Sequence, residues 1–291
     1  MKLLSVLVPS RNEEWLSQTI DDIFKHSELG EELEILVGDD GSDEYAPMGK
    51  FEGFTTYSVK VGNDWPKNWP KILNIVREEK SIGQRAMQNK LAELAKGKYL
   101  MKLDAHVSMS QGFDKIMLEI MEANPDIVLV PAFTNLHVYN WVCPQGHRTY
   151  QGKVLKCSQC DETKLEKELI WKNNTKIYSD FRFNDDLIFE YGDLENYEMF
   201  HSVEAIQGSG WIVERDNYWK WNLCDESWGS WGSQGYEIWK KVLNNGSKTF
   251  VTRKAFMGHF FRKADEFPYE RDMKQVDMAY QKSKELFAKS V

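Results

Sequence analysis

The sequence predicts an α/β fold in which helices flank a mainly parallel sheet. Two features of the first half of the chain support this prediction. Apolar runs typical of buried strands alternate with stretches whose apolar residues recur at helical spacing. This alternation favours parallel pairing, because a helix is the usual crossover between parallel strands. The 291 residues are enough to bury a sizeable core.

The strands and helices can be assigned in order along the chain. Leu3–Val8 predicts the first strand, and apolar residues between Trp15 and Phe24 predict a helix. The segment "ELEILVGDDGSDE" supplies a second strand, followed by a helix from Ile82 to Ala95 that ends at Gly97. The strand "KYLMKLDAH", a helix over 113–123 and the strand "DIVLVPAF" complete this half.

The alternation breaks at Asn140. Residues 141–172 are polar, contain three of the four cysteines, and regain helix-like character at "DETKLEKELIWK", so we interpret them as an insertion. Beyond it, "AIQGSGWIVERDNYWKW" predicts a strand and turn, "WGSQGYEIWKKVLNNG" a helix, and "KTFVTRKAFMGHFFRK" a pair of strands. Residues 273–289 predict an amphipathic C-terminal helix.

Composition narrows the class of protein. The net charge of -8 and the pI near 5.4 disfavour a nonspecific polyanion binder. No apolar run approaches the roughly 18 residues that span a bilayer, so no membrane span is predicted. The N-terminal apolar stretch runs into Pro9 without a small-residue cleavage pattern, and we expect a cytoplasmic protein.

Acidic residues follow two of the predicted strands, at Asp39, Asp40 and Asp104. Ligands of such sheets bind at the carboxyl ends of the strands, so this edge is the predicted active site. Asp104 and His106 together suit a divalent ion such as Mn²⁺, with positions left for phosphate oxygens. Alternatively, both segments are ordinary strand ends and turns, since Asp-Gly at 40 and 41 is a common turn dipeptide.

The insertion has metal-ligand spacing of its own. Cys143, His147, Cys157 and Cys160 are spaced as ligands of a tetrahedral structural Zn²⁺ in a small ribbon. Four protein ligands leave no open position, so we predict a role in folding. Reduced cysteines without metal are the alternative. Cys224 stands apart and is interpreted as a small buried residue.

Several motifs together resemble nucleotide-sugar glycosyltransferases of the GT-A fold. They are "VLVPSRNE", "ILVGDDGS", a helix with Gly83, Arg85 and Asn89, and the Asp-containing strand end. "LDAH", "WGSWGSQGYEIWKKV" and "MGHFFRK" resemble the retaining polypeptide N-acetylgalactosaminyltransferases in particular. The resemblance implies a nucleotide-sugar-binding half at 1–140 and, after the insertion, an acceptor-binding half with the C-terminal helix at 173–291.

The resemblance also implies roles for individual residues. Asp104, His106 and His259 would bind Mn²⁺ or Mg²⁺, and Asp39 or Asp40 would meet the uracil. The implied nucleotide-sugar pocket comprises Pro9, Arg11, Glu13, Asp39, Asp40, Gly83, Arg85, Asp104 and Trp231. For His259, a packed histidine beside Phe260 is the alternative.

The implied catalytic residues are Asp104, Gln234 and Glu237. Gln234 departs from the resembling enzymes, which carry a Glu in their Trp-Gly-Gly-Glu-Asn segment. A neutral amide can orient a sugar hydroxyl but cannot act as a carboxylate base or nucleophile. Glu237 is one helical turn further along. A purely structural role for this aromatic segment is the alternative.

The function that we expect is metal-dependent transfer of a hexose or N-acetylhexosamine from a UDP-sugar to an acceptor hydroxyl; retention of configuration is implied only by the resemblance. The acceptor stays open between a glycan, a protein and a hydroxymethylated base in DNA. The basic residues Arg148, Lys153 and Lys156 of the insertion favour DNA, and the acidic net charge disfavours it. A non-catalytic protein that binds a sugar nucleotide, or interacts through its ribbon, is the alternative of another class.

Overall fold

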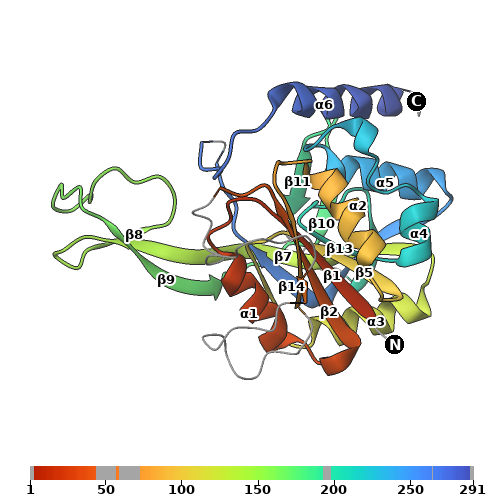
Figure 1. Ribbon diagram of the computed structural model, residues 1–291, viewed down its shortest axis with the longest axis horizontal. Helices are drawn as coiled ribbons and strands as arrows, with labels where there is room; N and C mark the ends of the chain where they lie inside the picture. Colours follow the sequence, from red (N-terminus) through yellow and green to blue (C-terminus); the bar gives the residue numbers. More distant parts are fainter. Residues whose placement is uncertain (1–2, 44–56, 59–72, 193–197, 264, 289–291) are drawn as a thin grey trace.

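A computed structural model describes residues 3–43, 57–58, 73–192, 198–263 and 265–288 (Figure 1). The strands of its main sheet are β1 (Leu4–Ser10), β2 (Leu33–Asp40), β3 (Tyr57–Ser58), β4 (Leu73–Glu78), β5 (Tyr99–Leu103), β6 (Val107–Met109), β7 (Ile127–Val142), β8 (Arg148–Tyr150), β9 (Glu166–Asn173), β12 (Phe200–Val203), β13 (Gly210–Glu214) and β14 (Lys248–His259). A separate hairpin pairs β10 (Asp180–Phe183) with β11 (Phe189–Gly192).

The central strand order is β12-β14-β7-β13-β5-β1-β2-β4-β3. Strands β5, β1, β2 and β4 are mutually parallel, and β7 is parallel to β14. Strand β13 joins these two blocks by antiparallel pairing to β5 and β7. The predicted α/β class with a mainly parallel central sheet is therefore confirmed.

Helices cover both blocks of the sheet. They are α1 (Leu16–His26), α2 (Gln84–Leu94), α3 (Phe113–Ala123), α4 (Arg215–Lys220), α5 (Gln234–Asn244) and α6 (Met273–Ala288), with short 3₁₀ turns at Gly30–Glu32 and Glu226–Trp228. Helix α2 packs on β1 and β2, and α3 packs on β7 and β14. Gly38 permits the close approach of α2, because a Cβ there would lie 2.4 Å from the Met87 sulfur.

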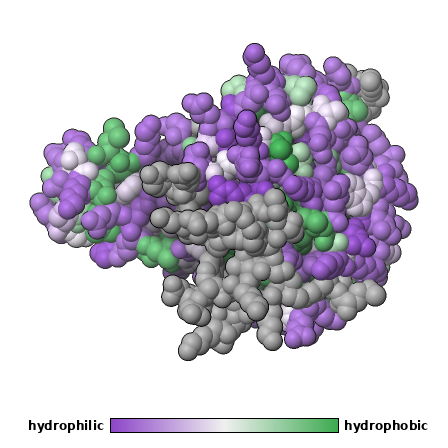
Figure 2. Space-filling view, in the orientation of Figure 1, coloured by the Kyte–Doolittle hydropathy of each residue, from purple (hydrophilic) through white to green (hydrophobic). Residues whose placement is uncertain are grey.

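Strands β7 and β9 extend beyond the body of the sheet as a two-stranded arm that carries β8 (Figure 1). Strand β7 is continuous through residues 140 and 141, where we placed the start of the insertion. The arm bears exposed apolar surface (Figure 2). Among its apolar side chains, Leu155 is 79% exposed and Leu169 is 51% exposed.

Three local predictions are wrong. The segment around "EKELIWK" is not helical but forms β9, because antiparallel pairing with β7 outweighs its helical composition. The predicted pair of strands over 248–263 is one strand, β14, with a register shift between Thr252 and Phe256. The expected turn after β13 is helix α4. The predicted C-terminal helix ends at Ala288, and its last predicted residue, Lys289, lies outside the described residues.

Candidate active site

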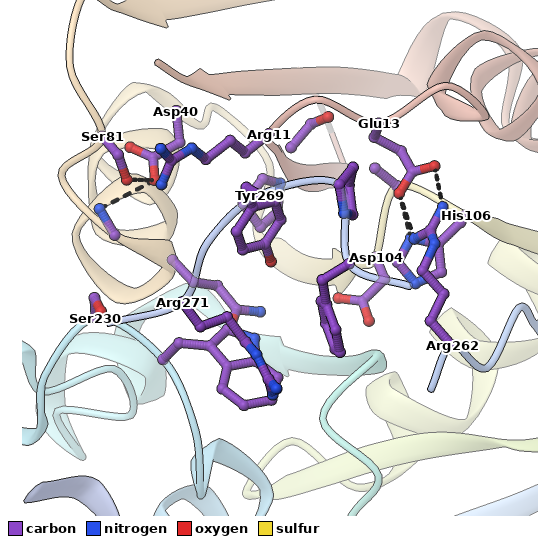
Figure 3. A pocket seen from close by; sticks show the side chains of 18 of the residues that line it. Arg11, Glu13, Asp40, Ser81, Asp104, His106, Ser230, Arg262, Tyr269 and Arg271 are labelled. Atoms are coloured by element: carbon purple, nitrogen blue, oxygen red, sulfur yellow. Dashed lines mark hydrogen bonds and ion pairs between the residues drawn. The ribbon is translucent and has the colours of Figure 1, made fainter. Parts of the chain in front are cut away.

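A pocket of about 510 Å³ lies at the carboxyl ends of β1, β2 and β5 (Figure 3). The loop after β1, the segment before α2, the end of β14 and the chain leading into α6 form its walls. Among the residues lining it are Pro9, Arg11, Glu13, Asp40, Ser81, Gly83, Asp104, His106, Ser230, Trp231, His259, Arg262, Tyr269 and Arg271. Residues far apart in the sequence therefore meet at the edge predicted for the active site.

Asp104, His106 and His259 converge at one side of this pocket, with their candidate ligand atoms all within 4.8 Å of one another. Asp104 directly follows β5, and His259 ends β14 in register with Val107 of β6. Asp104 Oδ2 lies 3.1 Å from His259 Nε2. Adjacent ligands of an octahedral ion with bonds of about 2.1 Å are about 3.0 Å apart, so this pair fits a divalent cation.

The protonation states suit metal binding. Burial by itself would raise the pKa of the Asp104 carboxyl, but Lys102, His259 and His106 outweigh burial and hold this pKa well below its usual range. Burial lowers the pKa of His259 to about 4, against the opposing effect of Asp104. At neutral pH the group therefore offers an ionised carboxylate and a neutral imidazole, the forms that bind metal ions. His259 Nδ1 is also buried without a hydrogen-bond partner among the described residues.

Glu13 orients His106. Its carboxylate receives hydrogen bonds of 2.7 Å from both terminal nitrogens of Arg262, and Oε2 lies 2.9 Å from His106 Nδ1. Burial would raise the pKa of Glu13, but His106 and Arg262 lower it to about 2. An ionised carboxylate only accepts, so the contact with Glu13 favours the tautomer with the proton on Nδ1, which leaves the Nε2 lone pair for a metal; Arg262 also lies 3.2 Å from Nδ1. Glu13 lines the pocket as predicted, but its carboxylate is occupied by protein groups.

Asp40 is occupied in a similar way. It accepts hydrogen bonds from the Ser81 hydroxyl (2.7 Å), the Ile82 N–H (2.7 Å) and the Gly83 N–H (3.1 Å), and so ties the end of β2 to the start of α2 (Figure 3). Gly83 has φ +93°, and a Cβ there would lie 2.5 Å from the Ser230 Cβ, so glycine is needed for the close approach of the two loops.

Of the two aspartates expected to meet the uracil, Asp40 lines the pocket and Asp39 does not. Asp39 does not line the pocket; its carboxylate is buried, accepts from the Ser42 N–H at 3.1 Å and lies 3.5 Å from Arg77. Because β-strand side chains alternate between faces, only one of two successive aspartates points to the ligand edge, and here it is Asp40.

Arg85 and Glu237 lie outside the pocket lining. They form a buried ion pair of 2.7 Å, with side-chain exposures of 1% and 0%, and neither lines the pocket. Arg85 also donates to the Gly229 carbonyl (2.9 Å) and the Gly232 carbonyl (2.6 Å), which flank the pocket residues Ser230 and Trp231. The three hydrogen bonds of Arg85 support this loop, and the predicted nucleotide contact of Arg85 and catalytic role of Glu237 stay predictions.

Gln234 is buried beneath the pocket wall. Its amide nitrogen donates to Gln88 Oε1 at 3.0 Å and to the Cys224 sulfur at 3.3 Å. It does not line the pocket, and its predicted catalytic role stays a prediction. Cys224 is buried, as its isolated position suggested.

The part of the pocket wall formed by Arg262 and residues 267–272 was not predicted from the sequence. Arg271 lies over the rings of Trp231 (5.2 Å) and Phe267 (4.3 Å), and Arg11 lies 5.3 Å from the Tyr269 ring. Arg11 Nε is buried with no partner among the described residues. The mixture of arginine and aromatic residues that follows His259 in the sequence could have indicated this part of the binding pocket. This wall brings positively charged arginine side chains into the same pocket as Asp104, His106 and His259.

The four insertion residues also come together. Cys143 Sγ lies 3.7 Å from Cys160 Sγ, and Cys157 Sγ lies 3.6 Å from His147 Nδ1. All four cluster beyond the end of β7, on the arm.

With this geometry in place, comparison with known proteins decides the family. The model of the family described as "Glycosyl transferase family 2" matches residues 5–170. The chain belongs to glycosyl transferase family 2. The predicted resemblance is thereby confirmed at the level of the family.

Relatives of this family 2 chain include the N-acetylgalactosaminyltransferase 7 of Rattus norvegicus, 22% identical over 263 residues, which are 89% of this chain and 36% of the relative. A putative polypeptide N-acetylgalactosaminyltransferase 13 of Drosophila melanogaster is 19% identical over 293 residues, 99% of this chain and 47% of the relative. The chain spans about a third to a half of the length of these relatives.

A solved structure described as GalNAc-T7 with UDP, GalNAc and Mn²⁺ superposes with a TM-score of 0.67 at 18% identity, covering 97% of this family 2 chain and 48% of the other. This similarity shows a common GT-A fold. Within the described residues, none of the helices combines the length and apolar character needed to cross a membrane.

Proposed function

We propose that the chain transfers a hexose or N-acetylhexosamine from a UDP-sugar to an acceptor hydroxyl, with Mn²⁺ or Mg²⁺ as cofactor. The observation that carries this proposal is the convergence of Asp104, His106 and His259 in a pocket at the strand ends. Family membership supports glycosyl transfer, and the donor and metal named for the GalNAc-T7 structure support the choice of UDP-sugar and Mn²⁺.

Asp104, His106 and His259 would hold the ion through one carboxylate oxygen and two imidazole nitrogens. When bound, the ion supplies positive charge that neutralises the diphosphate of the leaving group. Lys102 fixes the other Asp104 oxygen and donates to the Gly208 carbonyl at 2.6 Å, while Glu13 fixes His106. The ligands are thus oriented by the chain itself, which is the usual function of such outer contacts.

The arginines of the pocket would bind the donor. Arg11 Nε has no hydrogen-bond partner within the described part of the chain, and Arg271 lies beside Trp231, so phosphate contacts and stacking of the base or sugar are available together. In the transfer, the bond from sugar C1 to the UDP oxygen breaks, a bond from C1 to the acceptor oxygen forms, and the acceptor proton leaves with UDP. Retention of configuration is part of the proposal and rests on the resemblance alone.

The first experiment measures UDP release from a panel of UDP-sugars with Mn²⁺ and with EDTA. We expect slow hydrolysis of one donor that EDTA abolishes, because the ion stabilises the departing diphosphate. This result would identify the sugar before an acceptor is known. If UDP and Mn²⁺ bind by calorimetry but no donor ever turns over, the non-catalytic alternative is correct; if neither binds, the assignment of the pocket is wrong.

A DNA acceptor is disfavoured by the ion pairs of the arm. Its basic residues, which suggested DNA, are paired: Arg148 with Glu168 (2.7 Å), Lys153 with Asp265 (2.9 Å) and Lys156 with Asp161 (2.6 Å). We expect a Kd above about 10⁻⁴ M for duplex DNA at physiological salt. Fluorescence anisotropy with plain and hydroxymethylated duplexes across a salt series checks this. Micromolar binding that weakens steeply with salt would restore DNA as an acceptor. Otherwise the acceptor we propose is a hydroxyl of a glycan or protein.

A further inference from the structure

We infer that Cys143, His147, Cys157 and Cys160 bind one structural Zn²⁺ that holds the outer part of the arm together. This inference does not depend on the proposed glycosyl transfer, since none of the four residues lines the pocket. It concerns residues 143–165, which lie between β7 and β9.

The distances match a tetrahedral zinc site. With Zn–S bonds of about 2.3 Å and Zn–N bonds of about 2.0 Å, tetrahedral geometry places two sulfurs about 3.8 Å apart and a sulfur and nitrogen about 3.5 Å apart. The observed separations are 3.7 Å for Cys143 and Cys160, and 3.6 Å for Cys157 and His147. A disulfide would require sulfurs about 2.05 Å apart, and all of these cysteines are free.

The local backbone is folded around the sulfurs. The Gly146 N–H donates to the Cys143 carbonyl at 2.8 Å, and the turn returns the chain so that the Cys143 N–H donates to His147. At the second turn, the Gln159 N–H approaches Cys157 Sγ at 3.5 Å. Each turn therefore presents two ligands toward the same point, which a packing role for the cysteines would not require.

The outer arm also lacks a core that could hold it without metal. Between residues 143 and 165, the only buried residues are Cys143 and Cys157. A segment of this size with no apolar interior cannot offset the conformational entropy of ordering its backbone, whereas binding to structural zinc contributes enough free energy to fold small domains. The two buried cysteines are thus the interior of this segment.

The root of the arm is held by different contacts. Trp15, Tyr139 and Phe260 form an apolar cluster there, and Trp141 donates its indole N–H to the Gly152 carbonyl at 2.7 Å. Phe260 also lines the pocket. Because this root has its own packing, we expect zinc loss to release the outer arm while the catalytic pocket keeps its shape.

The test begins with metal analysis of the purified full-length chain by mass spectrometry; all samples carry Asp104→Ala, so that zinc at the pocket is not counted. We expect about one zinc per chain. Cys157→Ser and His147→Ala should lose it, whereas His147→Cys should keep it, because Cys₄ sites also bind zinc. Cys224→Ala is the matched control and should retain full zinc content.

Two further measurements keep the inference testable if a variant folds poorly. Cobalt exchanged into the native chain should give intense thiolate-to-metal absorption, and chelation should make residues 143–165 the first site of proteolysis.

Donor hydrolysis by Cys157→Ser should stay within about threefold of the native rate, since a closed four-ligand site has no catalytic position. Native chain expressed with ample zinc that contains no metal, or that reacts with thiol reagents at all three cysteines, would overturn the inference.

Discussion

Replacing Asp104 by Asn is expected to reduce metal-dependent UDP release by about 10²- to 10³-fold. The amide removes the only anionic ligand of the cluster, and the lost stabilisation of the leaving diphosphate amounts to several kcal/mol. The side chain keeps its size, so the fold should be retained. The rate of UDP release and the Mn²⁺ affinity from calorimetry should fall together.

Asp277→Asn is the control for this substitution. Asp277 is an exposed aspartate on α6, outside the pocket, and its replacement should leave both quantities unchanged. A different result would reject the metal assignment: if Asp104→Asn turned over donor at the native rate and EDTA still abolished that activity, the ion would be bound elsewhere.

Arg85→Met is expected to destabilise the protein by about 3 kcal/mol or more, because breaking a buried ion pair leaves Glu237 without its main partner. The Gly229 and Gly232 carbonyls would also lose their donors. Lys241 and the Asp225 N–H still bind Glu237, which limits the loss. Urea unfolding measures the change in the free energy of unfolding, and donor KM should rise because the Trp231 loop loses its support.

Two further variants separate the possible roles of Arg85. Arg182→Met removes an arginine whose side chain is 59% exposed and paired with Glu190. It should lower the free energy of unfolding by less than about 1 kcal/mol. Arg85→Lys keeps the positive charge but cannot reach all three partners. Its free energy of unfolding should therefore lie between those of the native chain and Arg85→Met. If Arg85→Met were as stable as the native chain but had lost nucleotide binding, the direct contact first predicted from the sequence would be correct.

Much of this fold is visible in the sequence because apolar periodicity reports burial. Strands ending at Asp40 and Asp104 were predicted from their buried runs, and their shared edge followed from parallel pairing. Strand β9 was not predicted, because its pairing with β7 is a long-range interaction and most of its residues, EKELIWKN, are polar. Local composition there favours a helix, and tertiary pairing decides otherwise.

Roles of individual side chains were harder to predict. His259 is distant from Asp104 in the chain and was assigned from a motif, since no periodicity pairs residues so far apart. Arg11 and Arg85 look equally cationic in sequence, yet one lines the pocket and the other is sealed inside by Glu237. The direction in which a long side chain points depends on partners from other elements, which a single sequence does not specify.

The three hydrogen bonds at Asp40 have a consequence for the thermodynamics of donor binding. They hold residues 81–83 in place through contacts within the chain, so in the function that we propose this part of the pocket is ordered before a nucleotide binds. Ordering a loop on binding opposes affinity through lost conformational entropy, and preorganisation removes that cost. In the function that we propose, Asp40 therefore contributes to donor binding by ordering residues 81–83, and this contribution is made during folding.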